Sequence, residues 1–111
     1  MTEHPIHDLD DDVHQRVRLG ILAILNGASR ADFAFLRKTL GLTDGNLGKH
    51  LQVLEEAGYV AIDKVFENRR PRTWVKITRP GRAALDEELA ALREVIASAE
   101  RGATNESLSA G

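Results

Sequence analysis

The amino-acid sequence predicts a mostly helical α+β domain with the order helix, helix, helix, strand, strand, helix. Apolar residues recur at helical spacing over residues 13–54 and again over residues 85–99. Between them, residues 59–62 and 72–78 contain the β-branched and aromatic residues typical of strands. The length of 111 residues fits a single domain.

The first helix is expected over residues 13–25, whose apolar residues recur every three to four positions. An aspartate of residues 10–12 would cap its start, and Asn26-Gly27 is a stop signal. Residues 29–31 then form a short connector with room for a single extended pairing.

A second helix is expected over residues 32–40, ending at Gly41, and a third helix begins after a link of three residues. Thr43 would cap this third helix, and Gly58 would stop it. Two short helices joined by a tight turn form a helix-turn-helix pattern, although many helical proteins contain such corners.

The two strands are expected to form a hairpin with a basic turn at residues 67–71. Thr78 would then cap a fourth helix, with Pro80 in its first turn, that extends to about Glu100. The small polar residues 102–111 are predicted to be disordered.

The charge is unevenly distributed along the chain. The formal net charge of −2 argues at first against a nucleic-acid partner. However, residues 1–12 sum to −5, residues 13–82 to +7 and residues 83–111 to −4. A basic middle segment between acidic ends is compatible with nucleic-acid binding.

Composition excludes several other classes of protein. The absence of cysteine excludes a disulfide scaffold, a thiol nucleophile and a thiolate metal site. The acidic start has no apolar stretch and does not resemble a signal peptide, and no uncharged run is long enough to span a bilayer. These features predict a cytoplasmic protein with no membrane contact.

The third helix presents a polar outward face suited to a DNA groove. With Leu47, Leu51 and Leu54 turned inward, the opposite side of its first turns is small or hydrogen-bonding, with one cation. Such groups can pair with base edges or phosphate. The predicted recognition residues are Thr43, Gly45, Asn46, Gly48, Lys49, His50 and Gln52. The alternative for the two glycines is that they only relieve crowding between helices.

The hairpin supplies a second basic element that can reach phosphates or a minor groove. Its predicted DNA-contacting residues are Lys64, Arg69, Arg70, Arg72 and Lys76. The alternative is an ordinary solvated turn, but the neighbouring helix-turn-helix pattern favours DNA.

The fourth helix predicts a homodimer. At 1.5 Å per residue it would be about 33 Å long, more than so small a domain can cover. The side chains expected in the interface are those of Val13, Val17, Leu85, Leu89, Leu92 and Ile96. The alternative is that this helix folds back on its own domain.

Two segments carry a family resemblance: DFAFLRKTLGLTDGNLGKHLQVLEEAGYV and RRPRTWVKITRPGRAAL. They resemble winged helix-turn-helix regulators of the ArsR/MarR type, and especially small stand-alone winged-helix DNA-binding proteins. The resemblance implies that residues 43–50 begin the recognition helix, that residues 64–76 form the wing, and that the helix from Thr78 dimerises. Gly48 departs from the family, which has a small hydroxyl residue at this position.

The sequence thus predicts four segments: an acidic arm (1–12), a winged helix-turn-helix domain (13–79), a dimerisation helix (80–101) and a tail (102–111). The predicted function is a homodimeric, sequence-specific regulator that binds a palindromic double-stranded DNA site. The resemblance implies repression by blocking polymerase. No cofactor and no metal are assigned, and a small-molecule effector near Trp74 or the N-terminal segment is left open.

Three rival functions can be stated from the residues. His4, His7 and His14, with the aspartates at 8 and 10–12, could serve a metal-responsive sensor of the ArsR type. A winged helix could instead act as a protein–protein interaction module. An enzyme is disfavoured, because no nucleophile–base pair, paired carboxylates or phosphate-binding loop stands out.

Overall fold

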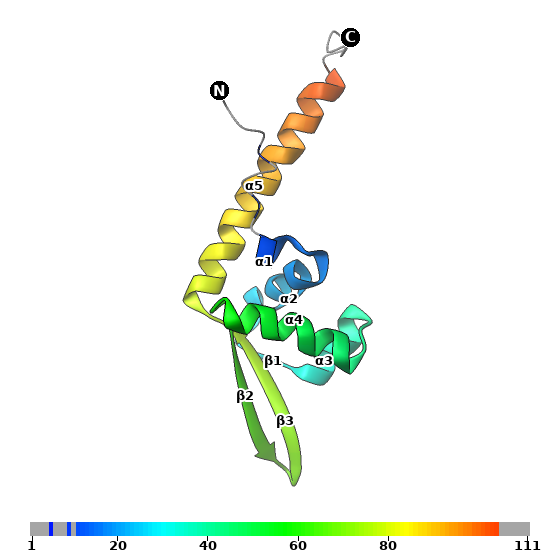
Figure 1. Cartoon of the computed structure of the whole chain (residues 1–111), viewed down its shortest axis with the longest axis vertical. Helices are drawn as coiled ribbons and strands as arrows, with labels where there is room; N and C mark the ends of the chain where they lie inside the picture. Colours follow the sequence, from blue (N-terminus) through cyan, green and yellow to red (C-terminus); the bar gives the residue numbers. More distant parts are fainter. Residues whose placement is uncertain (1–4, 6–8, 10, 105–111) are drawn as a thin grey trace.

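The computed structural model describes residues 5, 9 and 11–104, and it confirms the predicted mostly helical α+β fold (Figure 1). The helices are α1 (Asp11–His14), α2 (Arg16–Asn26), α3 (Phe33–Leu40), α4 (Asp44–Glu56) and α5 (Arg79–Thr104). The strands are β1 (Ala31–Asp32), β2 (Val60–Glu67) and β3 (Arg70–Ile77). In Figure 1 the β2–β3 hairpin and the far end of α5 project from opposite ends of the helical body.

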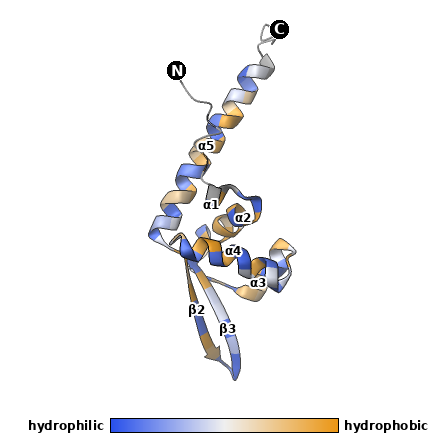
Figure 2. Ribbon diagram, in the orientation of Figure 1, coloured by the Kyte–Doolittle hydropathy of each residue, from blue (hydrophilic) through white to orange (hydrophobic). Residues whose placement is uncertain are grey.

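One hydrophobic core joins the helices to the base of the hairpin. Aliphatic side chains from α2, α3, α4, both hairpin strands and the first turns of α5 meet there, and Figure 2 shows that hydrophobic and hydrophilic residues alternate along these helices. The fully buried large side chains of this core include those of Ile21, Leu22, Leu25, Leu36, Leu47, Leu54 and Leu85.

The segment predicted as one first helix forms two helices in the structure, α1 and α2. Gln15 has φ −56° and ψ 129°, which interrupts the helix between α1 and α2. Its side-chain oxygen accepts hydrogen bonds from the backbone N–H groups of Val17 (2.8 Å) and Arg18 (3.1 Å). Gln15 therefore caps α2. The aspartate cap expected from residues 10–12 would belong to the start of α1, where Asp10 lies outside the described residues. Glutamine is seldom chosen from sequence as a cap, since shorter side chains are preferred there.

The helix-turn-helix agrees with the prediction at Gly41 and Thr43. Asp32, expected as the first residue of the second helix, lies just before α3 and caps it by accepting a hydrogen bond from the N–H of Phe35 (2.7 Å). Gly41 ends α3 with φ 65°, in the left-handed region that glycine adopts without strain. Thr43 Oγ1 accepts from the N–H of Asn46 and caps α4 (3.1 Å).

The sheet has the order β1-β3-β2 and is antiparallel throughout the described residues. The expected extended pairing exists, at Ala31 and Asp32 opposite Val75 and Trp74. The hairpin strands are longer than predicted, because the turn is only Asn68-Arg69. Both residues have positive φ, 50° and 64°, as a two-residue turn of this handedness requires.

Tight packing joins the base of the hairpin to α5. Thr78 Oγ1 donates to the carbonyl of Gly58 (2.6 Å) and accepts from the N–H of Gly81 (3.0 Å). A Cβ on Gly81 would overlap the backbone of Tyr59, so this position requires glycine. Thr78 caps α5 as predicted.

The helix α5 extends to Thr104, beyond the predicted end near Glu100. The first three residues of the predicted tail, 102–104, are therefore helical, and residues 105–111 lie outside the described residues. Across the residues that the structure describes, no helix combines the length and the apolar character needed to span a membrane.

Candidate nucleic-acid interface

The helix α4 buries one side and exposes the side that was predicted to face DNA. Leu47, Leu51 and Leu54 are buried in the core. The exposed recognition candidates are Thr43, Gly45, Asn46, Lys49 and Gln52, whereas Gly48 and His50 are half-buried. The orientation of the helix thus follows its apolar pattern, and five of the seven candidates are accessible to a partner.

Open space surrounds both glycines of α4. A Cβ added to Gly45 or Gly48 would meet no atom outside its own helix within 4 Å. The alternative that these glycines relieve crowding between helices is therefore not supported by the packing. Glycine costs roughly 1 kcal/mol relative to alanine in a helix. Since packing within the chain does not require these glycines, their cost is compatible with a role in letting a partner approach the surface of α4.

An ion pair connects the two helices of the helix-turn-helix. Arg37 Nε lies 3.0 Å from Asp44 Oδ1, across the turn between α3 and α4. Asp44 would otherwise place an isolated negative charge beside the exposed face of α4. Pairing with Arg37 reduces the repulsion that this carboxylate would exert on a phosphate.

His50 lies against α2 rather than among the outward residues. Its Nδ1 is 3.4 Å from Nη1 of Arg18. Burial of the ring, and then the positive charge of Arg18, lower the pKa of His50. Arg18 in turn donates from Nε to the carbonyl of Asp12 (2.7 Å). These contacts place the imidazole at the edge of the predicted face, where it links α4 to α2.

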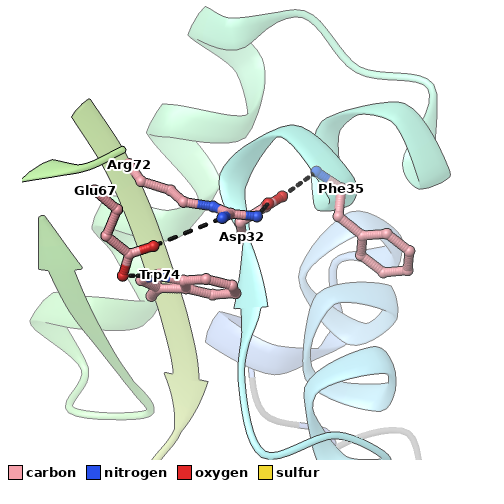
Figure 3. A network of polar contacts seen from close by, with 5 residues as sticks. All are labelled: Asp32, Phe35, Glu67, Arg72 and Trp74. Atoms are coloured by element: carbon pink, nitrogen blue, oxygen red, sulfur yellow. Dashed lines mark hydrogen bonds and ion pairs between the residues drawn. The ribbon is translucent and has the colours of Figure 1, made fainter. Parts of the chain in front are cut away.

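On β3, two residues after Arg70 at the turn, Arg72 belongs to a polar network (Figure 3). Its Nη2 donates to Asp32 Oδ2 (2.8 Å), and its Nη1 lies 3.6 Å from Glu67 Oε2. Glu67 Oε1 also accepts from Trp74 Nε1 (3.1 Å). The guanidinium of Arg72 lies over the Trp74 ring, 4.4 Å from its centroid, and that of Arg30 lies 3.6 Å from the same centroid.

The electrostatics of this network favour the charged forms of Asp32 and Arg72. The hydrogen bond from Arg72, followed by that from the N–H of Phe35, lowers the pKa of Asp32 against the opposing effect of burial. The same bond from Asp32 raises the pKa of Arg72. Because two carboxylates and an aromatic ring hold its guanidinium, Arg72 connects the hairpin to the start of α3. Its side chain is also 43% exposed, so its contact with DNA stays a prediction beside this positioning role.

The remaining wing candidates are all exposed, but they do not share one face. Lys64 pairs across the hairpin with Thr73, and Lys76 pairs with Ala61. Since side chains alternate along a strand, Lys64 and Lys76 point to opposite faces. Within residues 11–104, the structure shows no carboxylate in ion-pair contact with Arg69 or Arg70 at the turn.

A groove brings the helix and the hairpin together. It lies between α4 and the face of the hairpin that carries Lys64. Its lining residues are Phe33, Gly48, Leu51, Gln52, Glu55, Ile62, Lys64 and Thr73. Three predicted DNA-contacting residues, Gly48, Gln52 and Lys64, therefore share one concave surface.

The predicted dimer residues fall into two groups. Val13 and Leu85 are buried in the core of a single chain, which leaves them no surface for a partner. Val17 and Leu89 are partly buried and pack against the same core. Leu92 is half-buried and Ile96 is 57% exposed, farther along α5.

The sequence interpretation missed the network around Arg72 and Trp74, whose other members are Asp32, Glu67 and Arg30. A single local signal existed, the aspartate before an apolar run, and it indicated the cap of α3 only. Of the histidine and aspartate cluster proposed for a metal, His4, His7, Asp8 and Asp10 lie outside the described residues. Among the described residues, no three histidine or acidic side chains gather in a way that could hold a metal ion.

Comparison with known proteins gives a consistent result. Residues 17–96 match the model of the winged helix DNA-binding domain family. An uncharacterized protein of Methanocaldococcus jannaschii is 47% identical over 68 residues, covering 61% of this chain and 74% of that protein. The structure of a transcriptional regulator homologue from Pyrococcus horikoshii OT3 is 37% identical with a TM-score of 0.79, covering 87% of this chain and 97% of that one. The transcriptional repressor CouR, bound to a 23-mer DNA duplex, is 23% identical with a TM-score of 0.60, covering 94% and 75%.

The fold, the exposed face of α4 and the basic hairpin define a winged-helix DNA-binding transcriptional regulator. The chain belongs to the winged helix DNA-binding domain family, which confirms the resemblance found in the sequence. This family is typically non-enzymatic. The likeness to CouR, at 23% identity, shows the shared fold alone.

Proposed function

We propose that this chain acts as a homodimer that binds a palindromic double-stranded DNA site and represses transcription from it. Residues 13–79 would bind DNA, and residues 80–101 would form the dimerising helix. The observation that carries the proposal is the exposed, polar start of α4, with two glycines open to an approaching surface. CouR is a transcriptional repressor seen with duplex DNA, and it provides the precedent for this fold.

In the proposed complex, α4 enters the major groove. Asn46 can pair with an adenine edge, and Lys49 with guanine or phosphate. The glycines at 45 and 48 let the helix backbone approach the groove closely. Arg69 and Arg70 at the hairpin turn then contact phosphates or the adjacent minor groove.

The exposed far part of α5 supports a dimer. Ile96 is 57% exposed and continues the apolar stripe beyond the part of α5 that the core covers. A second copy of α5 is the simplest cover, and a two-fold dimer presents two recognition helices to half-sites about 34 Å apart.

Selection of binders from a random duplex library tests the DNA part of this proposal. We expect an enriched palindrome whose half-sites are about one helical turn apart. If the library shows no enrichment at low salt, sequence-specific DNA binding is wrong. Enrichment of an unrepeated site would retain the DNA function but contradict the symmetric dimer.

Sedimentation tests the dimer directly. Replacing Leu92 and Ile96 with glutamate should give monomers, because each new charge would have to be buried in the interface. Arg93→Glu, at an exposed position of the same helix, is the matched control and should remain dimeric. A dimer that persists in the double variant would exclude this part of α5 from the interface.

A small-molecule effector is not needed for DNA binding as proposed. Effectors can be tested by adding candidate compounds to the complex with the selected duplex. Release of the DNA at a stoichiometric concentration of compound would identify one.

A further inference from the structure

The hairpin carries an exposed apolar pair next to its turn. Phe66 is 72% exposed, more than Phe35 (53%) or Ile96 (57%), the other large exposed hydrophobic residues of the described chain. Phe66 lies opposite Pro71 in the register of the hairpin, and Pro71 is exposed as well. Cross-strand partners project from the same face, so the two rings form one apolar surface.

The strand geometry brings these two side chains close together. Glu67 and Arg70 close the two-residue turn, so Phe66 and Pro71 form the next pair, which is not hydrogen-bonded. Side chains approach most closely in such pairs. Pro71 needs no hydrogen-bond donor there, and β1 pairs only with Trp74 and Val75, which leaves the other edge at Pro71 open.

The same hairpin face continues toward α4. Alternation along β2 places Ile62, Lys64 and Phe66 on one face. Ile62 and Lys64 line the groove beside α4, and Phe66 lies one step farther toward the turn. The apolar pair is therefore carried by the face of the hairpin that looks toward the recognition helix.

The charge around the pair favours a polyanionic partner. Lys64, Arg69 and Arg70 surround the pair in the hairpin and are exposed. The nearby carboxylate of Glu67 is held by Arg72 and Trp74. The turn thus combines an apolar projection with available cations, which suits the apolar sugar walls and phosphate rims of a DNA groove.

A second copy of this chain is a poorer occupant. The hairpin turn and the far end of α5 project from opposite ends of the molecule (Figure 1). A dimer formed through α5 therefore leaves the turn uncovered.

We propose that Phe66, backed by Pro71, is a wedge that enters the minor groove beside the site read by α4 and partly unstacks one base step. Arg69 and Arg70 hold the phosphates on either side of the wedge. The inference rests on the proposed DNA-binding function and adds to it a specificity at a base step that no side chain reads by hydrogen bonding. Pyrimidine–purine steps unstack most easily and should be preferred at that position.

The test uses the duplex selected by the unmodified protein, with 2-aminopurine placed at successive positions flanking the α4 site. We expect the fluorescence of the probe to rise at one step in each flank when the protein binds, because the base is unstacked there. Phe66→Ala should abolish this rise and weaken binding about tenfold. Phe35→Ala, which removes an exposed ring from α3, should preserve the rise.

A second pair of variants separates apolar insertion from size. Phe66→Leu should retain part of the fluorescence rise. Phe66→Gln, whose side chain is similar in size to leucine but polar, should lose it. Thermal melts should show all four variants folded, since the exposed rings contribute little to the core. Selection repeated with Phe66→Ala should lose the preference for a pyrimidine–purine step and keep the sequence read by α4.

The outcomes distinguish this inference from the function on which it rests. If the unmodified protein binds no duplex, the proposed function fails. If it binds but no probe position responds, or if Phe66→Ala behaves like the unmodified protein, the wedge is wrong and DNA binding stands. A Phe66→Ala effect on self-association alone would assign the turn to protein contact and also overturn the wedge.

Discussion

The arginines at the turn of the β2–β3 hairpin and the arginine two residues farther along β3 have different surroundings. On β3, Arg72 is held by Asp32, Glu67 and the ring of Trp74. At the turn, Arg69 and Arg70 are exposed, and no ion pair holds them within the part of the chain that the structure describes. Three arginines in four residues therefore divide into one that positions the hairpin and two that are available to a ligand. A local run of charge does not reveal this division.

The largest effect is expected at the joint between the hairpin and α5. Gly81→Ala would press a methyl group into the backbone of Tyr59 and should lower the free energy of unfolding by at least about 2 kcal/mol. Chemical denaturation measures the loss. Gly102→Ala, in a part of α5 with open space around it, is the control and should leave stability unchanged or slightly raised. Equal stability of the two variants would show that the joint can relax.

The next effect is expected on binding and concerns the turn. Replacing Arg69 and Arg70 with alanine should weaken binding to every duplex and reduce the slope of log K against log salt by about 1 for each arginine. The free energy of unfolding should hardly change, because both side chains are exposed. Titration of labelled DNA at several salt concentrations measures the slope. An unchanged slope would remove the turn from the interface.

On β3, Arg72→Ala should have the opposite pattern. We expect a loss of thermal stability that is smaller than that of Gly81→Ala, because the ion pairs of Arg72 are partly exposed. The affinity for DNA should fall through misplacement of the hairpin, while the salt slope stays close to that of the unmodified protein. A slope reduced as strongly as in the turn variants would instead make Arg72 a direct phosphate ligand.

The Asp32–Arg72 contact also predicts a pH dependence. The hydrogen bond from Arg72 lowers the pKa of Asp32 in the folded protein below its ordinary value of 3.8. Asp32 therefore contributes stability above pH 3.8, and this contribution is lost as the pH falls through the lower folded pKa. Unfolding measured at about pH 6 and about pH 3 should show this acid loss in the unmodified protein. Asp32→Asn should reduce it. If both proteins lose the same stability on acidification, other carboxylates are responsible.

The smallest change in stability and binding is expected at Gly48 of α4. Like the exposed arginines at the turn, this residue is not held by packing against another element. Gly48→Ala should raise the free energy of unfolding by up to about 1 kcal/mol, because alanine is the better helix former. The same variant should bind the selected duplex more weakly if the helix backbone approaches the groove closely. Calorimetry measures the gain in stability, and DNA titration on the same sample measures the loss of affinity. A variant that is more stable and binds equally well would show that Gly48 has no role in DNA contact.

Much of the fold could be predicted from local patterns. Thr43 and Thr78 were expected as caps, Gly41 as a stop signal, and the leucine stripe of α4 as its inner face; each is a short-range preference that acts through neighbouring residues. The turn at Asn68-Arg69 was not predicted. The pairing of two eight-residue strands determines that turn, and the proline next to it suggested a longer loop.

The candidate site also combines a feature that was predicted from local patterns with contacts that were not. The exposed face of α4 followed from helical periodicity, since leucines at helical spacing along one helix orient it. The contacts of Arg72 with Asp32, of Trp74 with Glu67, and of His50 with Arg18 join residues 40, 7 and 32 positions apart. No local preference selects such partners.

The sequence by itself therefore determined the order of the elements, the caps of α4 and α5, and the side of α4 that faces outward, because these depend on interactions within a few residues. The tertiary structure alone decided which cations are available and which glycine is indispensable. Gly81 is constrained by the backbone of Tyr59, and Arg72 by a carboxylate on another element. Both constraints arise only when segments distant in sequence pack against one another.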